Sequence, residues 1–97
     1  MKFDSIAERT RAIELISSEQ NGEISGLEYQ PAFILQDRFE HNGKHHRAIK
    51  YVADFRYIKN EKTIVEDVKG METDVYKMKR KLFIKLFKPN FIESRLK

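Results

Sequence analysis

The sequence predicts a mixed α/β domain in which a helix precedes a three-stranded meander and a second helix precedes a last strand. Two stretches with helical periodicity, 5–20 and 73–87, enclose a segment rich in aromatic and β-branched residues, 27–69. Turn signals divide that segment, and Asn42-Gly43 is the strongest of them. A chain of 97 residues has room for one hydrophobic core, so we expect a single domain over residues 1–97.

The first helix is predicted over residues 5–20 and is amphipathic. Its apolar positions recur at helical spacing: Ile6, Thr10, Ile13 and Ile16. Ser5 and Glu8 form a capping-box pattern at its start. Gly22, in the segment 21–26, is placed to end it.

Three strands are predicted next, over 27–39, 47–58 and 63–69. Pro31 inside the first predicts an edge strand or a bulge. The Asn42-Gly43 turn joins the first two strands, and residues 59–62 join the second to the third. Gly70 ends the third strand.

The second helix is predicted over 73–87, with Val75, Met78, Leu82 and Leu86 as its buried face. Pro89 ends it, and residues 90–96 are predicted to form the last strand.

Composition excludes several classes of protein. With 40% hydrophobic residues the chain is expected to be globular rather than disordered. No apolar run approaches the roughly 18 residues that a membrane span needs, and the first residues contain no apolar signal segment. The absence of cysteine excludes disulfides and thiolate metal sites and fits the reducing cytoplasm.

Positive charge is concentrated near the C-terminus. The net charge is +4, yet from Met71 onward eight basic residues face three acidic ones. Such a patch is typical of a protein that binds a polyanion, most often nucleic acid. The alternative is an ordinary solvated helix face.

Strand alternation predicts that two carboxylates meet at the end of the third strand. Residues i and i+2 share a face, so Asp67 and Lys69 lie on one face with Val65, and Glu66 lies on the other. The short turn at 59–62 makes this strand an antiparallel neighbour of 47–58. In that strand an aromatic-apolar face is expected from Tyr51, Ala53, Phe55 and Tyr57. Asp54 interrupts this run and is expected near Asp67.

Two carboxylates held together repel each other, and a divalent cation removes the conflict. Mg²⁺ prefers such ligands together with waters and phosphate oxygens. Lys69 would then orient or deprotonate an attacking water, or stabilise charge on the phosphate. The alternative is a plain salt bridge at the sheet edge, because an acid-x-lysine triplet alone is a weak motif.

Asp54, followed thirteen residues later by Asp67-Val68-Lys69, resembles the signature of the PD-(D/E)XK nucleases, with Ala53 where the motif has proline. The closer resemblance is to small, mostly phage-encoded proteins of that superfamily whose function is uncharacterised. Its matching segments cover nearly the whole chain: KFDSIAE, LEYQPAF, YVADFRY, VEDVKG and TDVYKMKRKLF.

The resemblance implies an αβββαβ core with a mixed central sheet flanked by helices. It also implies that Glu8 matches the helical glutamate of archaeal Holliday-junction resolvases and joins Asp54, Asp67 and the backbone carbonyl of Val68 as a metal ligand. The alternative for Glu8 is the capping box. Gln30 matches the glutamine–proline pair of the family, where it either orients a water or bonds across the sheet.

Two further groups bear on binding. Lys77, Arg80 and Lys81 share a face of the second helix, opposite its apolar stripe, and with Tyr76 they are expected to contact the DNA backbone. The alternative is a solvated face. The histidines, His41, His45 and His46, flank the hairpin turn with no common zinc spacing, which favours a surface loop over a metal site.

These observations predict a Mg²⁺- or Mn²⁺-dependent endodeoxyribonuclease that hydrolyses phosphodiester bonds. By resemblance, its substrate is branched DNA such as a Holliday junction, cut by a homodimer in the cytoplasm, that of a bacterial host if the protein is phage-encoded. The rival is a non-catalytic protein that binds nucleic acid or a host protein on a nuclease-like fold.

Overall fold

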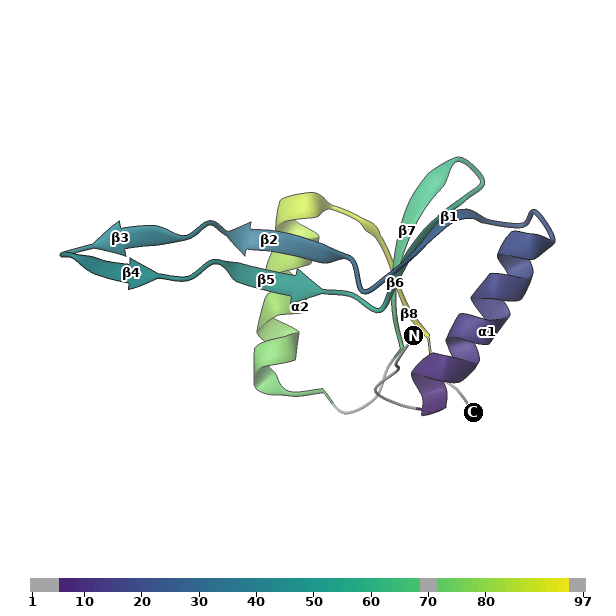
Figure 1. Cartoon of the computed structure of the whole chain (residues 1–97), viewed down its shortest axis with the longest axis horizontal. Coiled ribbons are helices and arrows are strands. Elements are labelled where there is room, and N and C mark those ends of the chain that lie inside the picture. Colours follow the sequence, from purple (N-terminus) through teal and green to yellow (C-terminus); the bar gives the residue numbers. More distant parts are fainter. Residues whose placement is uncertain (1–5, 69–71, 95–97) are drawn as a thin grey trace.

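The computed structural model describes residues 6–68 and 72–94. In it, a four-stranded mixed sheet lies between the two helices (Figure 1). The strands are β1 (Ser25–Tyr29), β6 (Phe55–Lys59), β7 (Lys62–Val68) and β8 (Asn90–Ser94), in the order β1-β6-β7-β8. The β1–β6 and β6–β7 pairs are antiparallel. The last pair, β7–β8, is parallel because helix α2 (Asp74–Phe87) forms the crossover between them. The predicted mixed α/β class is confirmed.

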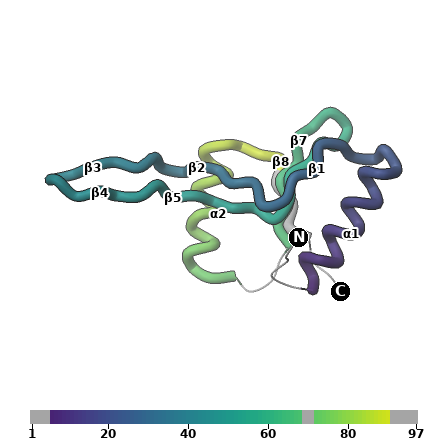
Figure 2. The backbone as a smooth tube through the Cα atoms, in the orientation of Figure 1, coloured from purple at the N-terminus to yellow at the C-terminus, as the bar shows by residue number. Residues whose placement is uncertain are grey.

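The segment between β1 and β6 forms a long hairpin that leaves the sheet. Its proximal pair is β2 (Ala32–Gln36) with β5 (Ile49–Val52), and its distal pair is β3 (Phe39–His41) with β4 (Lys44–His46). Asn42 and Gly43 turn the chain at its tip with positive φ angles of 50° and 75°, as the sequence predicts. The hairpin reaches well past α2, and the molecule measures 54 × 29 × 24 Å (Figure 2).

A bend separates this hairpin from the sheet. At the bend the Gln30 N–H donates to the Asp54 carbonyl at 2.9 Å, and the Ala53 N–H donates to the Pro31 carbonyl at 3.1 Å. Gln30 has a positive φ of 51°, and Pro31 is buried. The interruption predicted from Pro31 is therefore confirmed, and β1 is also an edge strand.

The bend also divides the buried residues between two clusters. Phe55 and Tyr57 pack on the α1 side, whereas Tyr51 and Ala53 pack on the α2 side. The prediction that these four residues share one face was wrong, because alternation holds only along an unbroken strand.

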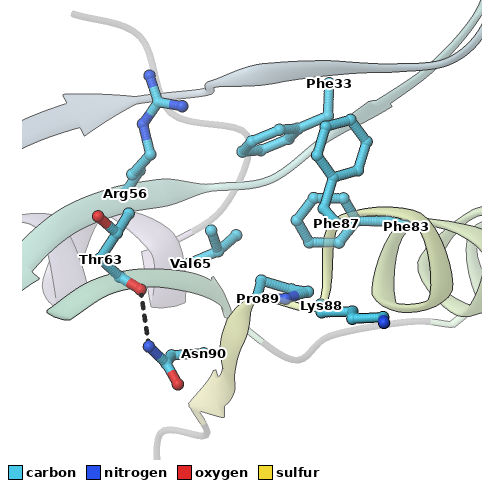
Figure 3. Close-up of a pocket in the computed structure, with 9 residues that line it drawn as sticks. All are labelled: Phe33, Arg56, Thr63, Val65, Phe83, Phe87, Lys88, Pro89 and Asn90. Carbon is cyan, nitrogen blue, oxygen red and sulfur yellow. Dashed lines mark hydrogen bonds between the residues drawn. The ribbon is translucent and has the colours of Figure 1, made fainter.

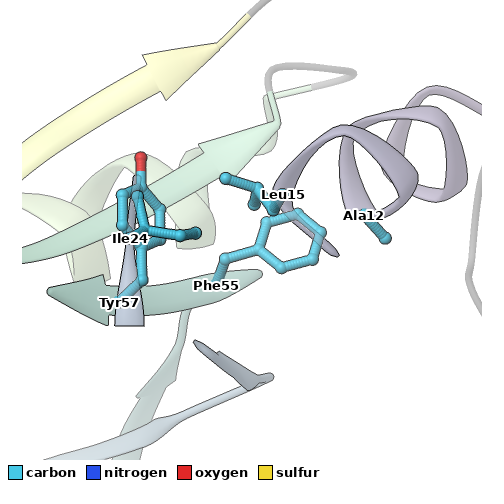
Figure 4. Packing of buried hydrophobic residues seen from close by; sticks show 5 residues of the cluster. All are labelled: Ala12, Leu15, Ile24, Phe55 and Tyr57. Atoms are coloured by element: carbon cyan, nitrogen blue, oxygen red, sulfur yellow. The ribbon is translucent and has the colours of Figure 1, made fainter. Parts of the chain in front are cut away.

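Helix α1 (Ile6–Gln20) has the predicted span, but it buries a different face. Glu8, Ala12 and Leu15 are buried, whereas Ile6, Ile13 and Ile16 are exposed. The small Ala12 side chain sits in the cluster that Figure 4 shows, with Leu15, Ile24, Phe55 and Tyr57. The predicted apolar face was wrong because the sheet offers this helix polar partners as well as apolar ones.

Helix α2 also has the predicted span, but the face that it buries is not the predicted one. Thr73 caps its start, where the Thr73 hydroxyl accepts a hydrogen bond from the Tyr76 N–H at 3.0 Å. Phe83 is fully buried, whereas Val75 is 57% and Leu82 is 40% exposed. The helix packs on β2 and β5 through aromatic rings, with Phe83 stacked on Tyr51 at 4.7 Å. Aromatic packing thus takes the place of the predicted aliphatic face, Val75, Met78, Leu82 and Leu86, which points outward.

Neither helix of the described chain has the length and the apolar run that crossing a bilayer requires.

Candidate functional site

The bend places Asp54 beside the carboxyl end of β7. The Asp54 N–H donates to Asp67 Oδ1 at 2.9 Å, and the Val68 N–H donates to Asp54 Oδ2 at 2.7 Å. Each aspartate thus binds the backbone of the other's strand. The predicted proximity of Asp54 and Asp67 is confirmed. The strand pairing explains it, since Phe55 pairs with Glu66 and the next residues on each side are these two acids.

Asp67 is the more buried of the two, with 4% of its surface exposed. Its Oδ2 accepts hydrogen bonds from the hydroxyls of Tyr51 and Tyr76, the second at 2.9 Å. With the Asp54 N–H, these donors compensate the carboxylate for its loss of water. Tyr51 and Tyr76 come from β5 and α2, so Asp67 joins three elements. The sequence held one signal of this role: a tyrosine in a buried strand usually needs a partner for its hydroxyl.

The donor chemistry of this pair fits a hard divalent cation. Mg²⁺ is bound in proteins by one or two carboxylates, with waters and substrate oxygens completing the shell. Asp54 is half-buried, at the edge of the site, and Asp67 lies behind it. Among the residues whose side chains the structure describes, 6–68 and 72–90, no three acidic or histidine side chains are grouped closely enough to hold a metal by themselves. In a two-carboxylate arrangement, waters and substrate oxygens would supply the remaining ligands.

The structure describes only some of the other predicted members of the site. Glu8 is buried on the sheet side of α1 with Ala12 and Leu15. It does not complete a group of three metal ligands with Asp54 and Asp67 among the residues described. Lys69 and the capping partner Ser5 lie outside the described residues. Gln30 uses its backbone to bind Asp54, at the bend itself.

Glu66 lies on the opposite face of β7, as alternation predicts, and it is fully buried, with 0% exposed. Arg11 of α1 binds it in a bidentate pair, at 2.5 and 2.9 Å, and the Tyr57 hydroxyl donates to it at 2.7 Å. The hydrogen bond to Glu66 raises the pKa of Arg11 above its ordinary value. Burial and the bond to Glu66 raise the pKa of Tyr57 to about 12. This network ties α1 to the sheet behind the aspartates.

The four predicted DNA contacts on α2 separate into two kinds. Tyr76 donates to Asp67, and Arg80 forms an ion pair with Glu72 at 2.7 Å while it lies over the Tyr76 ring. Tyr76 thus contacts Asp67 directly, and Arg80 contacts Tyr76. Lys77 and Lys81 are exposed. Contact of any of the four with DNA stays a prediction.

A pocket of about 300 Å³ opens farther along the same face of β7 (Figure 3). Val65 and Thr63 form its floor, and Phe33, Phe83 and Phe87 form an apolar wall. Arg56 and Asn90 line the pocket as well, and Asn90 donates to the Thr63 carbonyl at 3.3 Å. Neither aspartate lines it, so it is separate from the carboxylate site.

The histidines lie at the far end of the hairpin, on exposed strands, as the turn signal predicts. His46 stacks on Phe39, and His45 lies 3.0 Å from Glu40. No histidine is part of a metal-binding group in the described part of the chain.

Comparison with known proteins gives the family of the chain. No curated protein and no solved structure matches it. One family model matches residues 1–96, which is nearly the whole sequence. The chain therefore belongs to the family described as "Protein of unknown function (DUF1064)".

Proposed function

We propose that the protein is a metal-dependent DNA endonuclease with a PD-(D/E)XK core. The observation that carries the proposal is the linked pair of Asp54 and Asp67 at the end of β7, with Lys69 two residues farther along. The arrangement of α1, β1, β6, β7, α2 and β8 supports it, because these elements give the expected αβββαβ order once the hairpin is set aside.

In this proposal Asp54 and Asp67 hold Mg²⁺ or Mn²⁺ with the Val68 carbonyl. Glu8, which forms no three-ligand group with the two aspartates, acts through a water. The ion supplies a Lewis acid that polarises a phosphate oxygen and makes its bound water more acidic. Tyr51 and Tyr76 keep the Asp67 carboxylate in one orientation. Such positioning matters because misplacement by about 1 Å costs on the order of a hundredfold in rate.

Lys69 orients the attacking water and offsets the negative charge that builds on the phosphate. The water oxygen bonds to phosphorus in line with the P–O3′ bond, which breaks. The products are a 5′-phosphate, which keeps the water oxygen, and a 3′-hydroxyl, which takes up a proton.

Branched DNA is the proposed substrate and a homodimer the proposed active form, in the cytoplasm of a bacterial host if the gene is carried by a phage. Each copy has one such site, and resolving a junction takes two cuts. The outward apolar stripe of α2, formed by Val75, Met78, Leu82 and Leu86, supports association of two copies.

A second candidate is a protein that binds nucleic acid or a host protein without cutting. The observation in its favour is that both oxygens of Asp67 accept hydrogen bonds from protein groups, which suits a structural carboxylate as well as a metal ligand.

Cleavage assays distinguish the two. Labelled four-way junction, nicked, linear and single-stranded DNA are incubated with excess protein and Mg²⁺ or Mn²⁺. We expect paired cuts in the junction, lost in Asp67→Asn and in Lys69→Ala and kept in the exposed control Glu23→Gln. Cutting of every substrate would retain the nuclease and remove the junction preference. Binding without cutting in either metal would favour the second candidate.

Metal binding has its own readout in thermal unfolding. A ligand that binds only the folded state stabilises it by about 2.7 kcal/mol at a hundredfold excess over Kd. We expect Mn²⁺ to raise the melting temperature of the wild type and of Lys69→Ala. No such rise is expected in Asp67→Asn.

A further inference from the structure

The distal half of the hairpin contributes nothing to either core. We call residues 37–48 the arm tip. Among the described elements, β3 and β4 have their main contacts with each other, and Figure 1 shows them projecting beyond α2. Phe39 is 45% exposed there, stacked on His46 with ring centroids 4.5 Å apart and planes 8° from parallel. This cross-strand ring pair stabilises its own ribbon and leaves aromatic surface open to a ligand.

Charge around this pair is positive. Arg38, Lys44 and Arg47 outnumber Asp37 and Glu40 in the arm tip. All three histidines of the protein are there as well, and each gains positive charge when protonated. A groove of about 500 Å³ lies on the tip, lined by Arg38, Phe39, Glu40, His45, His46 and Arg47. Two guanidinium groups thus border the stacked rings in one groove.

We infer that the arm tip is a second nucleic-acid contact, separate from the carboxylate site. Guanidinium groups bind phosphate oxygens, and a two-stranded ribbon is of a size that enters the major groove of a duplex. The exposed ring pair offers a surface on which an unpaired base stacks. Nucleic acid uses both features of the site, since its phosphates pair with the arginines and every base has a flat face that stacks on an aromatic ring. The inference rests on the proposed function only for the choice of DNA over RNA.

The position of the tip agrees with this role. Eight residues along the chain separate Asp54 from His46 of the ring pair, which at about 3.3 Å each gives roughly 26 Å. One turn of duplex DNA is longer, at roughly 34–36 Å. A duplex cut at Asp54 and Asp67 would therefore meet the ring pair within one helical turn of the cut.

The experiment measures binding of labelled duplex, single-stranded and junction DNA by fluorescence anisotropy, with EDTA present so that no cleavage occurs. Arg38→Gln/Arg47→Gln removes the two guanidinium groups, and Phe39→Leu removes the flat ring. The matched control is Lys59→Gln/Lys62→Gln, which removes two exposed cations beside the β6–β7 turn. Circular dichroism checks that each variant is folded.

We expect the double arginine variant to bind all three DNAs at least tenfold more weakly and to lower the salt slope of log K by about 2, since each phosphate contact contributes about 0.9. We expect Phe39→Leu to weaken single-stranded and junction binding about fivefold or more, with duplex binding unchanged. The lysine control should bind within twofold of wild type.

Arginine variants that bind as well as wild type would overturn the inference, as would polyglutamate that competes as well as DNA. Arm variants that lose binding in a protein that never cuts would contradict the proposed function and keep this inference. Arm variants that bind DNA and cut it normally would contradict this inference and keep the proposed function.

Discussion

The pair of Arg11 and Glu66 places a charged carboxylate in the interior of the protein. A carboxylate with no exposed surface must be neutralised or paired, and Arg11 is its cation. The residue reaches Glu66 from α1 because Glu8, Ala12 and Leu15 turn that side of the helix to the sheet.

Removing the cation tests this view. We expect Arg11→Met to lower the free energy of unfolding by about 3–5 kcal/mol, because it removes the cation that pairs with the buried Glu66 carboxylate. Arg11→Met/Glu66→Gln should recover part of the loss. The exposed Arg9→Met is the control, expected within about 0.5 kcal/mol of wild type. Urea denaturation measures the free energy of unfolding of all three variants. Equal losses in Arg9→Met and Arg11→Met would show that the Arg11–Glu66 pair adds no particular stability.

Tyr57 gives the network a pH signature. Its pKa is raised to about 12 in the folded protein by burial and by its bond to Glu66. A raised folded pKa means that the folded state holds the proton more tightly than the unfolded state, so the contribution to stability is full below about pH 10 and lost as pH rises through 12. Tyrosinate absorbance should show an ionisation step near pH 12 that is smaller by one tyrosine in Tyr57→Phe. A step of unchanged size in that variant would assign it to another tyrosine.

At this scale the sequence predicted the two aspartates and the side of β7 to which Asp67 and Glu66 belong, because alternation along one short strand is a local property. It did not predict that Tyr51, Tyr76 and Arg11 are their partners. Those contacts depend on how three elements pack, which no spacing within the chain determines.

Among the elements, α2 has the feature with the clearest consequence. Val75, Met78, Leu82 and Leu86 form a stripe directed away from the body. Their spacing is nearly the same in both directions along the helix, so two copies can pack antiparallel about a two-fold axis. Asp74 at one end would then approach Lys85 of the second copy.

A charge in the stripe should prevent association. We expect Leu82→Glu to elute as a monomer under conditions where the wild type is a dimer, by light scattering coupled to size exclusion. Ile84→Glu introduces the same charge at another exposed position of α2 and should remain dimeric. A wild type that is monomeric at high concentration would remove the dimer from the proposal.

Helix bounds followed from capping and proline signals, but the buried faces of both helices were assigned wrongly. Each helix has apolar residues on more than one side, so periodicity alone cannot choose among them. Aromatic partners on β2 and β5 determine which face of α2 is buried, and Glu66 determines which face of α1 is buried.

On the scale of the whole molecule, the distal half of the hairpin is separate in its packing from both core clusters. We expect that joining Gln36 to Ile49 through Asn-Gly would leave the melting temperature within about 4 °C of wild type, because the pairing of these residues positions a two-residue turn there. Differential scanning calorimetry measures it. A drop of 15 °C or more would mean that the distal ribbon supports the core.

The sequence predicted the hairpin, its turn and an interruption at Pro31, but not the matching break at Asp54 in the second predicted strand. That strand looked continuous because its aromatic run crosses the bend without a change in composition. Only the paired hydrogen bonds across it reveal that one half belongs to the sheet and the other to α2.

The tight turn at Asn42-Gly43 has a consequence for how the chain finds its fold. Ser25 pairs with Ile58, and closing so long a loop in one step is slow. A hairpin that starts at the turn brings Phe39 to His46, then Ala32 to Val52, and only then Tyr29 to Phe55. Each pairing shortens the loop that the next one must close. We therefore expect the distant contacts of the sheet to be reached by zippering, a sequence of local steps in which Asp54 is ordered when the bend forms.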